Sequence, residues 1–172
     1  MYLEETDEYK LYEVESMTAL NNENCTKIIR TQSQVYKTYY CVAFSGKLKF
    51  GLIGEGHGIP PHAERLSDHY IISLDDTLYV VNSQIGDISF KILDSLIFDI
   101  LFYADSIAII CELDVYSFCI KKNSLQLNWL ANIEDIVTGY KLTGKQLFIE
   151  SEEARAVIEL SNGYLNIVGK LL

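Results

Sequence analysis

The sequence predicts an all-β fold, an incomplete or small β-propeller-like array of about four antiparallel units with three or four strands each. Three observations support this prediction. Short apolar runs occur in pairs around polar turns, the pairs recur along the chain, and 12% of the residues are aromatic while only two are proline. Aromatic and β-branched side chains pack well on a pleated surface, and self-similarity at such intervals is typical of repeated small sheets. A two-sheet β-sandwich built from the same strands is the alternative.

Four hairpins carry the repeat. The clearest spans 71–81, where Asp75-Asp76 separates two apolar strands, and similar hairpins span 102–110 and 141–149, with a fainter one at 42–50. The second strands begin near Leu48, Leu78, Ile107 and Leu147, at intervals of 30, 29 and 40 residues. The run from Ile107 to Cys111 is apolar throughout, which is typical of a strand covered on both faces.

Further strands follow the hairpins. Alternation of apolar and polar residues predicts third strands at 88–92, 115–120 and 154–160, and fourth strands at 125–129 and 164–168. In the fourth strand at 125–129, Leu125, Leu127 and Trp129 alternate with polar residues, and we expect Trp129 to lie in the core.

The remaining segments complete a single all-β domain over residues 1–172. Residues 1–34 form an acidic N-terminal segment, in which a short alternating pattern near Tyr9 and the run 27–30 predict strands. Another strand is expected over 35–44, and single helical turns over 19–22 and 132–136. The stretch 54–68 contains both prolines and three glycines, so we expect a long loop there.

Charge and cysteine usage restrict the partners and the compartment. The net charge of −10 repels nucleic acid and acidic membranes and attracts basic proteins. No N-terminal signal sequence is recognisable, and no apolar run approaches the length of a membrane span, so we expect a cytoplasmic protein with no membrane partner. Cys25, Cys41, Cys111 and Cys119 form no Cys-x-x-Cys pair, which favours free thiols over the alternatives of a disulfide or a zinc site.

The three histidines are the residues that most resemble a reactive site. His57, His62 and His69 lie within thirteen residues of one another, close to acidic residues, and imidazole and carboxylate groups are suitable zinc ligands. Their spacing matches no short metal motif, and no nucleotide-binding loop or nucleophile elbow is present. We therefore expect no enzyme activity, no metal and no cofactor. A metal-dependent enzyme using this loop is one alternative, and a regulatory ligand-binding module is another.

Acidic turns are the candidate partner-binding site. In an up-and-down meander, successive turns alternate between the two ends of the strands. The turns at 84–87, 112–114 and 150–153 are predicted at one end, and they contain no lysine or arginine. The predicted partner-binding residues are Asp87, Glu112, Asp114, Glu150, Glu152 and Glu153. The opposite end has mixed charge, including Lys121, Lys122 and Lys145.

The order of several short stretches resembles a known protein family. These stretches are Gly54-x-Gly-His-Gly-Ile-Pro-Pro, Leu74-Asp-Asp-Thr-Leu-Tyr-Val-Val, Ile110-Cys-Glu-Leu-Asp-Val-Tyr-Ser-Phe, Asp135-Ile-Val and Leu160-Ser-Asn-Gly. Over about residues 50–165 the chain is similar to small cytoplasmic bacterial proteins built from propeller-like hairpin repeats, some of which are immunity proteins that neutralise a toxin encoded beside them. The resemblance implies a non-enzymatic immunity protein. Its partner would be a cognate toxin domain, and the acidic charge makes a basic nuclease the expected one.

Overall fold

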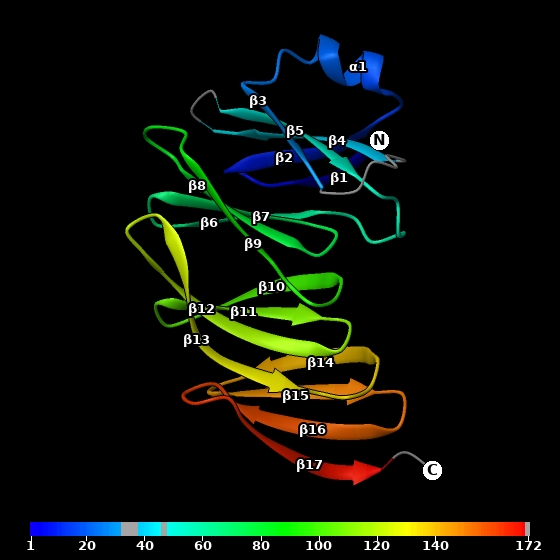
Figure 1. Cartoon of the computed structure of the whole chain (residues 1–172), viewed down its shortest axis with the longest axis vertical. Coiled ribbons are helices and arrows are strands. Elements are labelled where there is room, and N and C mark those ends of the chain that lie inside the picture. The colour runs from blue at the N-terminus through cyan, green and yellow to red at the C-terminus, as the bar shows by residue number, and fades with distance from the viewer. Residues whose placement is uncertain (32–37, 46–47, 171–172) are drawn as a thin grey trace. The chain divides into compact units, whose positions relative to one another are not determined.

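The chain folds mostly into strands, which form four sheets of four or five strands each (Figure 1). This computed structural model describes residues 1–31, 38–45 and 48–170. The chain divides into two compact units, Met1–Ile92 and Leu93–Leu172, with two sheets in each. The prediction of an all-β fold with four small sheets is confirmed, and the strands do not merge into the two sheets of the alternative sandwich. Among the described residues, no helix is long and apolar enough to cross a membrane.

The first sheet has the strand order β1-β2-β4-β5-β3. Its strands are β1 (Tyr2–Glu5), β2 (Tyr9–Val14), β3 (Lys27–Arg30), β4 (Thr38–Phe44) and β5 (Lys49–Gly54). The described part of the acidic segment, residues 1–31, therefore contributes three strands to this sheet. The β3 strand runs parallel to β5, while the other pairs are antiparallel. Residues 35–37 of the predicted strand and residues 46–47 of the faint hairpin lie outside the described residues.

Helix α1 (Met17–Asn22) covers one face of the first sheet, and it includes the predicted helical turn at 19–22. Ser16 caps the helix, because its hydroxyl oxygen accepts a hydrogen bond from the Ala19 N–H at 3.1 Å. Leu20 is fully buried against the sheet next to Cys41 and Ile53. The helix approaches closely because β5 has a glycine there: a Cβ on Gly51 would lie 3.1 Å from the Leu20 side chain.

The second sheet has the order β6-β7-β8-β9. Its strands are β6 (His62–Leu66), β7 (His69–Leu74), β8 (Thr77–Asn82) and β9 (Ile88–Ile92). The expected long loop at 54–68 is thus shorter, because β6 occupies its second half. This strand was missed because it is polar: as an edge strand it buries only Ala63 fully, and charged edge strands are common because they discourage unwanted pairing. The hairpin at 71–81 consequently forms the second and third strands of its sheet.

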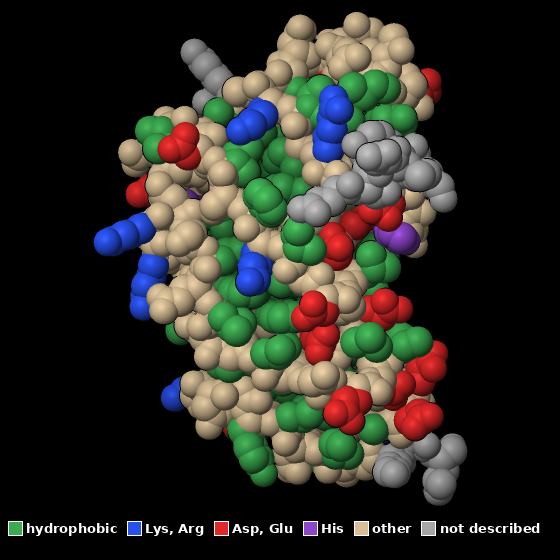
Figure 2. Space-filling model, viewed as in Figure 1, with side chains coloured by type: hydrophobic (Ala, Val, Ile, Leu, Met, Phe, Trp, Pro, Cys, Tyr) green, Lys and Arg blue, Asp and Glu red, His purple; other side chains and the backbone are tan. Residues whose placement is uncertain are grey.

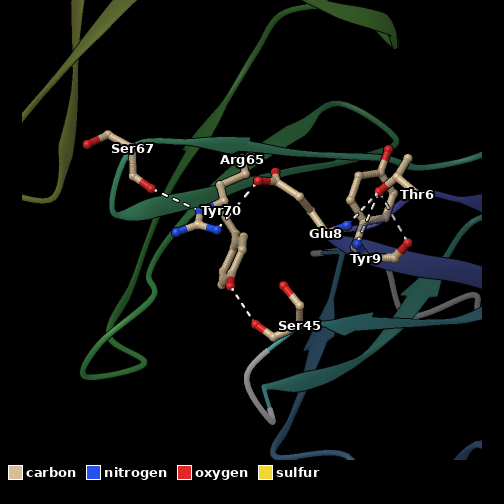
Figure 3. Close-up of polar contacts among 7 residues, drawn as sticks. All are labelled: Thr6, Glu8, Tyr9, Ser45, Arg65, Ser67 and Tyr70. Atoms are coloured by element: carbon tan, nitrogen blue, oxygen red, sulfur yellow. Dashed lines mark hydrogen bonds and ion pairs between the residues drawn. The ribbon is translucent and has the colours of Figure 1, made fainter.

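An aromatic core joins the two sheets of the first unit. Phe44 of β4 stacks on Tyr70 of β7, with ring centroids 3.7 Å apart. Polar contacts close the edge of this core (Figure 3): Tyr70 Oη donates to the Ser45 carbonyl at 3.2 Å, and Arg65 Nη1 lies 3.5 Å from Glu8 Oε1. The β1–β2 turn, which carries Glu8, is therefore tied to β6, and Ser45, which follows β4, is tied to β7.

The second unit contains two four-stranded antiparallel meanders, the third and fourth sheets. Their strands are β10 (Ile97–Tyr103), β11 (Ser106–Cys111), β12 (Asp114–Lys121), β13 (Ser124–Asn132), β14 (Val137–Thr143), β15 (Gln146–Ser151), β16 (Ala154–Glu159) and β17 (Tyr164–Lys170). The third and fourth strands predicted here are present. The helical turn expected over 132–136 is absent, because this segment is the connection from β13 to β14. In both sheets the first pair is irregular at the same place, next to Ile97 and next to Val137.

Trp129 packs the fourth sheet against the third. It belongs to β13, is 9% exposed and lies in the core shared by the two sheets, as predicted. Its Nε1–H donates a hydrogen bond to the Leu160 carbonyl at 2.8 Å, so the turn before β17 is attached to the neighbouring sheet. Gly163 in this turn has a φ of +73°, and a Cβ there would lie 2.7 Å from the indole ring. Only glycine fits both the backbone conformation and the contact.

The first prediction concerns the core of the third sheet. Ile109 is fully buried on β11 between Ile100 of β10 and Tyr116 of β12. Ile109→Ala should lower the free energy of unfolding by about 2–5 kcal/mol, through lost transfer energy and a residual cavity. Urea denaturation measures this cost. The control is Gln126→Ala at an exposed position of the same sheet, which should stay within about 0.5 kcal/mol of wild type; an equal, small loss in both variants would mean that β11 is not central.

The second prediction separates backbone strain from the Trp129 contact. Gly144 in the β14–β15 turn also has a positive φ, +60°, but a Cβ there meets no atom within 4 Å. Gly144→Ala should therefore cost only about 1–2 kcal/mol of left-handed strain. Gly163→Ala should cost about 1–3 kcal/mol more, because it also overpacks the indole. Thermal and urea unfolding of the two variants give the comparison, and equal losses would show that the turn moves away from Trp129 freely.

Candidate partner-binding surface

One end of the second unit is assembled from three acidic segments, which we call the acidic end. They are the β11–β12 turn, the β13–β14 connection and the β15–β16 turn. Backbone hydrogen bonds join them: Val137 N–H donates to the Glu112 carbonyl at 2.8 Å, and Glu152 N–H donates to the Ile136 carbonyl at 3.1 Å. The segment that leads into β10 belongs to this end too, because Glu112 N–H donates to the Leu96 carbonyl at 2.9 Å.

Carboxylates dominate the acidic end. They belong to Asp94, Glu112, Asp114, Glu134, Asp135, Glu150, Glu152 and Glu153. No lysine or arginine occurs in these turn segments themselves. Two basic residues of the fourth sheet lie next to the β15–β16 turn: Arg155 of β16, whose Nε lies 3.1 Å from Glu150 Oε1 in an exposed ion pair, and Lys170, which ends β17 and pairs with Ala154. Exposed pairs of this kind contribute about 0–1 kcal/mol. Figure 2 shows that, in the second unit, Asp and Glu side chains gather on the side of the molecule where these turns lie, at the right of the view.

The predicted residues Glu112, Glu150, Glu152 and Glu153 are brought together here. Glu152 and Glu153 are exposed, Glu150 is exposed and paired with Arg155, and Glu112 is half-buried. Among the described residues, no ion pair engages Glu152, Glu153 or the neighbouring Glu134. These three side chains therefore present their charge to solvent. Whether a partner binds them stays a prediction.

Asp114 is placed differently from the other predicted residues. It begins β12 and is 7% exposed, so its carboxyl group is no surface contact. Burial raises the pKa of Asp114, and the nearby Asp94 carboxylate raises it further. Asp94 is exposed and accepts a hydrogen bond from the Tyr116 hydroxyl at 3.0 Å. Asp94 is thus the surface acid of this corner, while Asp114 lies beneath it.

Asp135 fixes the shape of the acidic end. Its Oδ1 accepts from the Ile136 N–H at 2.8 Å, and its Oδ2 accepts from the Glu153 N–H at 2.7 Å. Hydrogen bonding by the Ser151 hydroxyl, and then by the Glu153 amide, lowers the pKa of Asp135. Because both carboxylate oxygens are used internally, Asp135 holds the Glu152-Glu153 turn rather than offering a free charge.

Asp87 is in the first unit, and its turn does not occupy the same position in its sheet as the turns that carry Glu112 and Glu153. Its turn joins β8 to β9 and is the third turn of the second sheet. In that meander the third turn lies at the opposite end from the second turn, Asp75-Asp76. The turns carrying Glu112 and Glu153 are second turns of their sheets, so the predicted equivalence of Asp87 with them is wrong. The error came from counting the Ile71 strand as a first strand when β6 precedes it.

The three histidines do not form a cluster. His57 lies in the loop 55–61, where its Nε2 is 3.1 Å from Glu55 Oε2. His62 and His69 lie at opposite ends of the β6–β7 hairpin, since His62 pairs with Ser73 and His69 with Leu66. No group of three or more histidine, cysteine or acidic side chains close enough to hold a metal ion occurs within the described residues. The geometry therefore offers no support for the alternative of a metal site at this loop.

The opposite end of the second unit carries the lysines and a groove. The β12–β13 turn has Lys122 and Asn123 at φ +51° and +63°, as a type I′ hairpin turn requires. A groove of about 650 Å³ lies between the two sheets. It is lined by Tyr103, Ser106, Leu127, Asn128, Trp129, Leu160, Ser161 and Asn162. Asn128 Nδ2 donates to the hydroxyl oxygens of Ser106 and Ser117, each at 3.2 Å.

Comparison with known proteins leaves the chain without an assigned relative. No protein-family model matches it, and no curated protein sequence is significantly similar. The fold and the geometry of the acidic end are therefore the observations on which a function is proposed.

Sequence reasoning missed Asp94, Glu134 and Asp135, although a signal for them exists. Leu93-Asp94-Ser95-Leu96-Ile97 and Ile133-Glu134-Asp135-Ile136-Val137 share the order apolar, acidic, polar, apolar, apolar. Both segments lead into the first strand of a sheet. In both, the side chain at the third position of the segment accepts a hydrogen bond from a backbone N–H in the second turn of the same sheet. Leu113 N–H donates to Ser95 Oγ at 3.4 Å, and Glu153 N–H donates to Asp135 Oδ2 at 2.7 Å. Aligning these segments would have located the entry of each sheet.

The third prediction tests the role of Asp135. Its folded-state pKa is lowered, so it stabilises the fold at pH values above the unfolded-state pKa, and this stabilisation is lost as the pH falls through the folded-state pKa. Asp135→Asn should lower the urea midpoint at about pH 7, and the difference from wild type should shrink below about pH 4. Asp105→Asn, an exposed change of equal charge in the β10–β11 turn, is the control. A difference for Asp135→Asn that is constant with pH would contradict this role.

Proposed function

We propose that the protein is a non-enzymatic binding protein whose acidic end binds a basic protein and blocks its activity. The observation that carries the proposal is the grouping of carboxylates at one end of the second unit, in turn segments that contain no lysine or arginine. Grouping like charges is unfavourable for stability, so it requires an explanation outside the stability of the fold. Complementarity to a basic surface provides one, because it speeds association and selects the partner.

The rigidity of the acidic end supports the proposal. Its turns are held by the backbone hydrogen bonds of Glu112, Val137 and Glu152, and by the side chain of Asp135. A surface that is already ordered loses little conformational entropy when a partner binds, so more of the interaction energy appears as affinity. Exposed carboxylates on fixed turns also suit a partner whose own site recognises phosphate groups.

The sequence resemblance narrows the partner. We propose that it is a toxin domain encoded beside the gene of this chain, and that the toxin is a basic nuclease. The protein would act as its immunity protein, either by covering the active site or by placing carboxylates where the nucleic acid phosphates bind. In this proposal the chain needs no catalytic residue, metal or cofactor, and it stays in the cytoplasm with the toxin.

The fourth prediction tests the binding surface by charge reversal. The triple variant Glu134→Lys, Glu152→Lys and Glu153→Lys changes three exposed side chains and leaves Asp135 and the buried Asp114 in place. Association with the purified product of the neighbouring toxin gene should slow by about tenfold or more at low salt, and its dependence on salt should weaken. Surface-based kinetics at several salt concentrations measure both effects, and thermal unfolding verifies that the variant is folded.

The matched control reverses charge at the other end of the same unit. Lys121→Glu, Lys122→Glu and Lys145→Glu alter the same number of exposed charges, and they should change the association rate much less. If this control and the acidic-end variant behave alike, or if the toxin product does not bind wild type at all, the proposed function is wrong.

The groove at the lysine-bearing end favours a second candidate, a regulatory ligand-binding module. It combines aromatic Tyr103 and Trp129 with the amide of Asn128, which is the mixture of apolar and polar groups typical of small-molecule sites. Hydrogen exchange distinguishes the two candidates. A toxin should protect the amides of the acidic end, whereas a small ligand in the groove should protect β13 and the turn at 160–163.

A further inference from the structure

Two cysteines meet beneath helix α1 in the first unit. The Sγ atoms of Cys25 and Cys41 lie 3.9 Å apart, and both residues are free thiols. Cys25 belongs to the short connection between α1 and β3, while Cys41 lies in β4 on the face covered by the helix. The distance in a disulfide is about 2.05 Å, so a shift of about 2 Å would join the two sulfurs.

The two thiols differ in access. Cys41 is fully buried, whereas Cys25 is half-buried and follows Asn24, whose φ is +53°. Cys25 lies on a short connection whose backbone is attached to β5, because Thr26 N–H donates to the Lys49 carbonyl at 2.6 Å. A reagent from solvent therefore reaches Cys25 first, and Cys41 is placed to react with Cys25 from inside.

Charged side chains surround the pair. Lys49 Nζ lies 2.6 Å from Glu23 Oε2, which also accepts a hydrogen bond from the Tyr12 hydroxyl at 2.7 Å. Burial raises the pKa of Cys25 and raises that of Cys41 to about 12, while the Lys49 ammonium acts in the opposite direction on both. The thiols are therefore mostly protonated at neutral pH, and their oxidation should accelerate as the pH rises.

We propose that Cys25 and Cys41 are a redox modification site, at which a small-molecule disulfide converts the two thiols into a reversible intramolecular disulfide. This inference is independent of the proposed function. Its consequence is structural: the bond would attach the connection after α1 covalently to the middle of the first sheet. Both α1 and β3 would then be held against β4 and β5 by a covalent bond in addition to side-chain packing.

The reaction proceeds in two exchange steps. The Cys25 thiolate attacks one sulfur of the small disulfide, forms a mixed disulfide and releases one small thiolate. Cys41 then loses its proton and attacks Cys25 Sγ, which forms the protein disulfide and releases the second small thiolate. The two protein thiols are oxidised, the small disulfide is reduced to two thiols, and the two thiol protons pass to the released thiolates or to solvent.

The fifth prediction is tested with oxidised glutathione on the full chain. Incubation in mildly alkaline buffer should lower the mass of the monomer by about 2 Da, and dithiothreitol should restore it. Trypsin cleaves after Lys10, Lys27, Lys37 and Lys47, so Cys25 and Cys41 fall in the separate peptides 11–27 and 38–47. These two peptides should appear linked before reduction. The oxidised protein should unfold about 5–10 °C higher than the reduced protein, because the bond restricts the unfolded chain.

Two pairs of variants serve as controls. Cys25→Ser and Cys41→Ser should each abolish the linked peptides, whereas Cys111→Ser and Cys119→Ser should leave them unchanged, since both of those cysteines lie in the single peptide 92–121. The map of the wild-type protein needs no variant to fold. Dimers joined through cysteine, a mixed disulfide that never resolves, or a bond inside peptide 92–121 as the main product would each overturn the proposal.

Discussion

The second unit depends on one hydrogen-bonded arrangement that it makes twice. In each sheet, the segment that enters the first strand is attached to the second turn: Glu112 N–H binds the Leu96 carbonyl, and Glu152 N–H binds the Ile136 carbonyl. The connection between the sheets is then attached to the third sheet as well, through Val137 N–H and the Glu112 carbonyl. Because backbone groups that leave water need partners, these bonds determine where each meander can begin relative to its own second turn. They also place the acidic segments side by side, so the same bonds that organise the unit create its most charged surface.

The opposite end of the unit is joined by side chains instead. Trp129 extends from β13 to the turn before β17, donates to the Leu160 carbonyl and packs against Gly163. A sheet with an apolar face must bury that face against another element, so each sheet packs against a neighbour that covers one of its faces. In the first unit, stacked Phe44 and Tyr70 serve this purpose between the two sheets, and α1 covers the other face of the first sheet. Backbone bonds at one end and a tryptophan at the other thus hold the third and fourth sheets in a single relative position.

Local patterns in the sequence were sufficient to locate most strands, but they did not show which position each strand takes in its sheet. Hairpins such as 71–81 are visible because both strands are apolar and the turn is polar. The edge strand β6 was not visible in the sequence, because a strand with one neighbour and one exposed face needs few apolar residues. That omission shifted the count of turns in the second sheet and grouped Asp87 with acids that belong to second turns. The burial of single side chains could not be predicted from the sequence either. The sequence around Asp114 is typical of an exposed turn, yet Asp114 is 7% exposed because it begins β12 beneath Asp94. The histidines were close in sequence, but a hairpin separates residues seven positions apart, such as His62 and His69, along its length.

The distribution of charge within the second unit is not what stability alone would favour. Interspersed charges minimise repulsion, whereas the acidic end gathers carboxylates and pairs only Glu150 with a described cation, Arg155. The fold offsets part of this cost by using Asp135 as a hydrogen-bond acceptor for two backbone amides and by leaving the remaining carboxylates in solvent, where water screens them. Asp94 and Asp114 are the exception, since burial and proximity raise the pKa of Asp114. A basic partner would relieve the repulsion among Glu134, Glu152 and Glu153, so the unfavourable electrostatics of the free protein become part of the driving force for binding in the proposed complex.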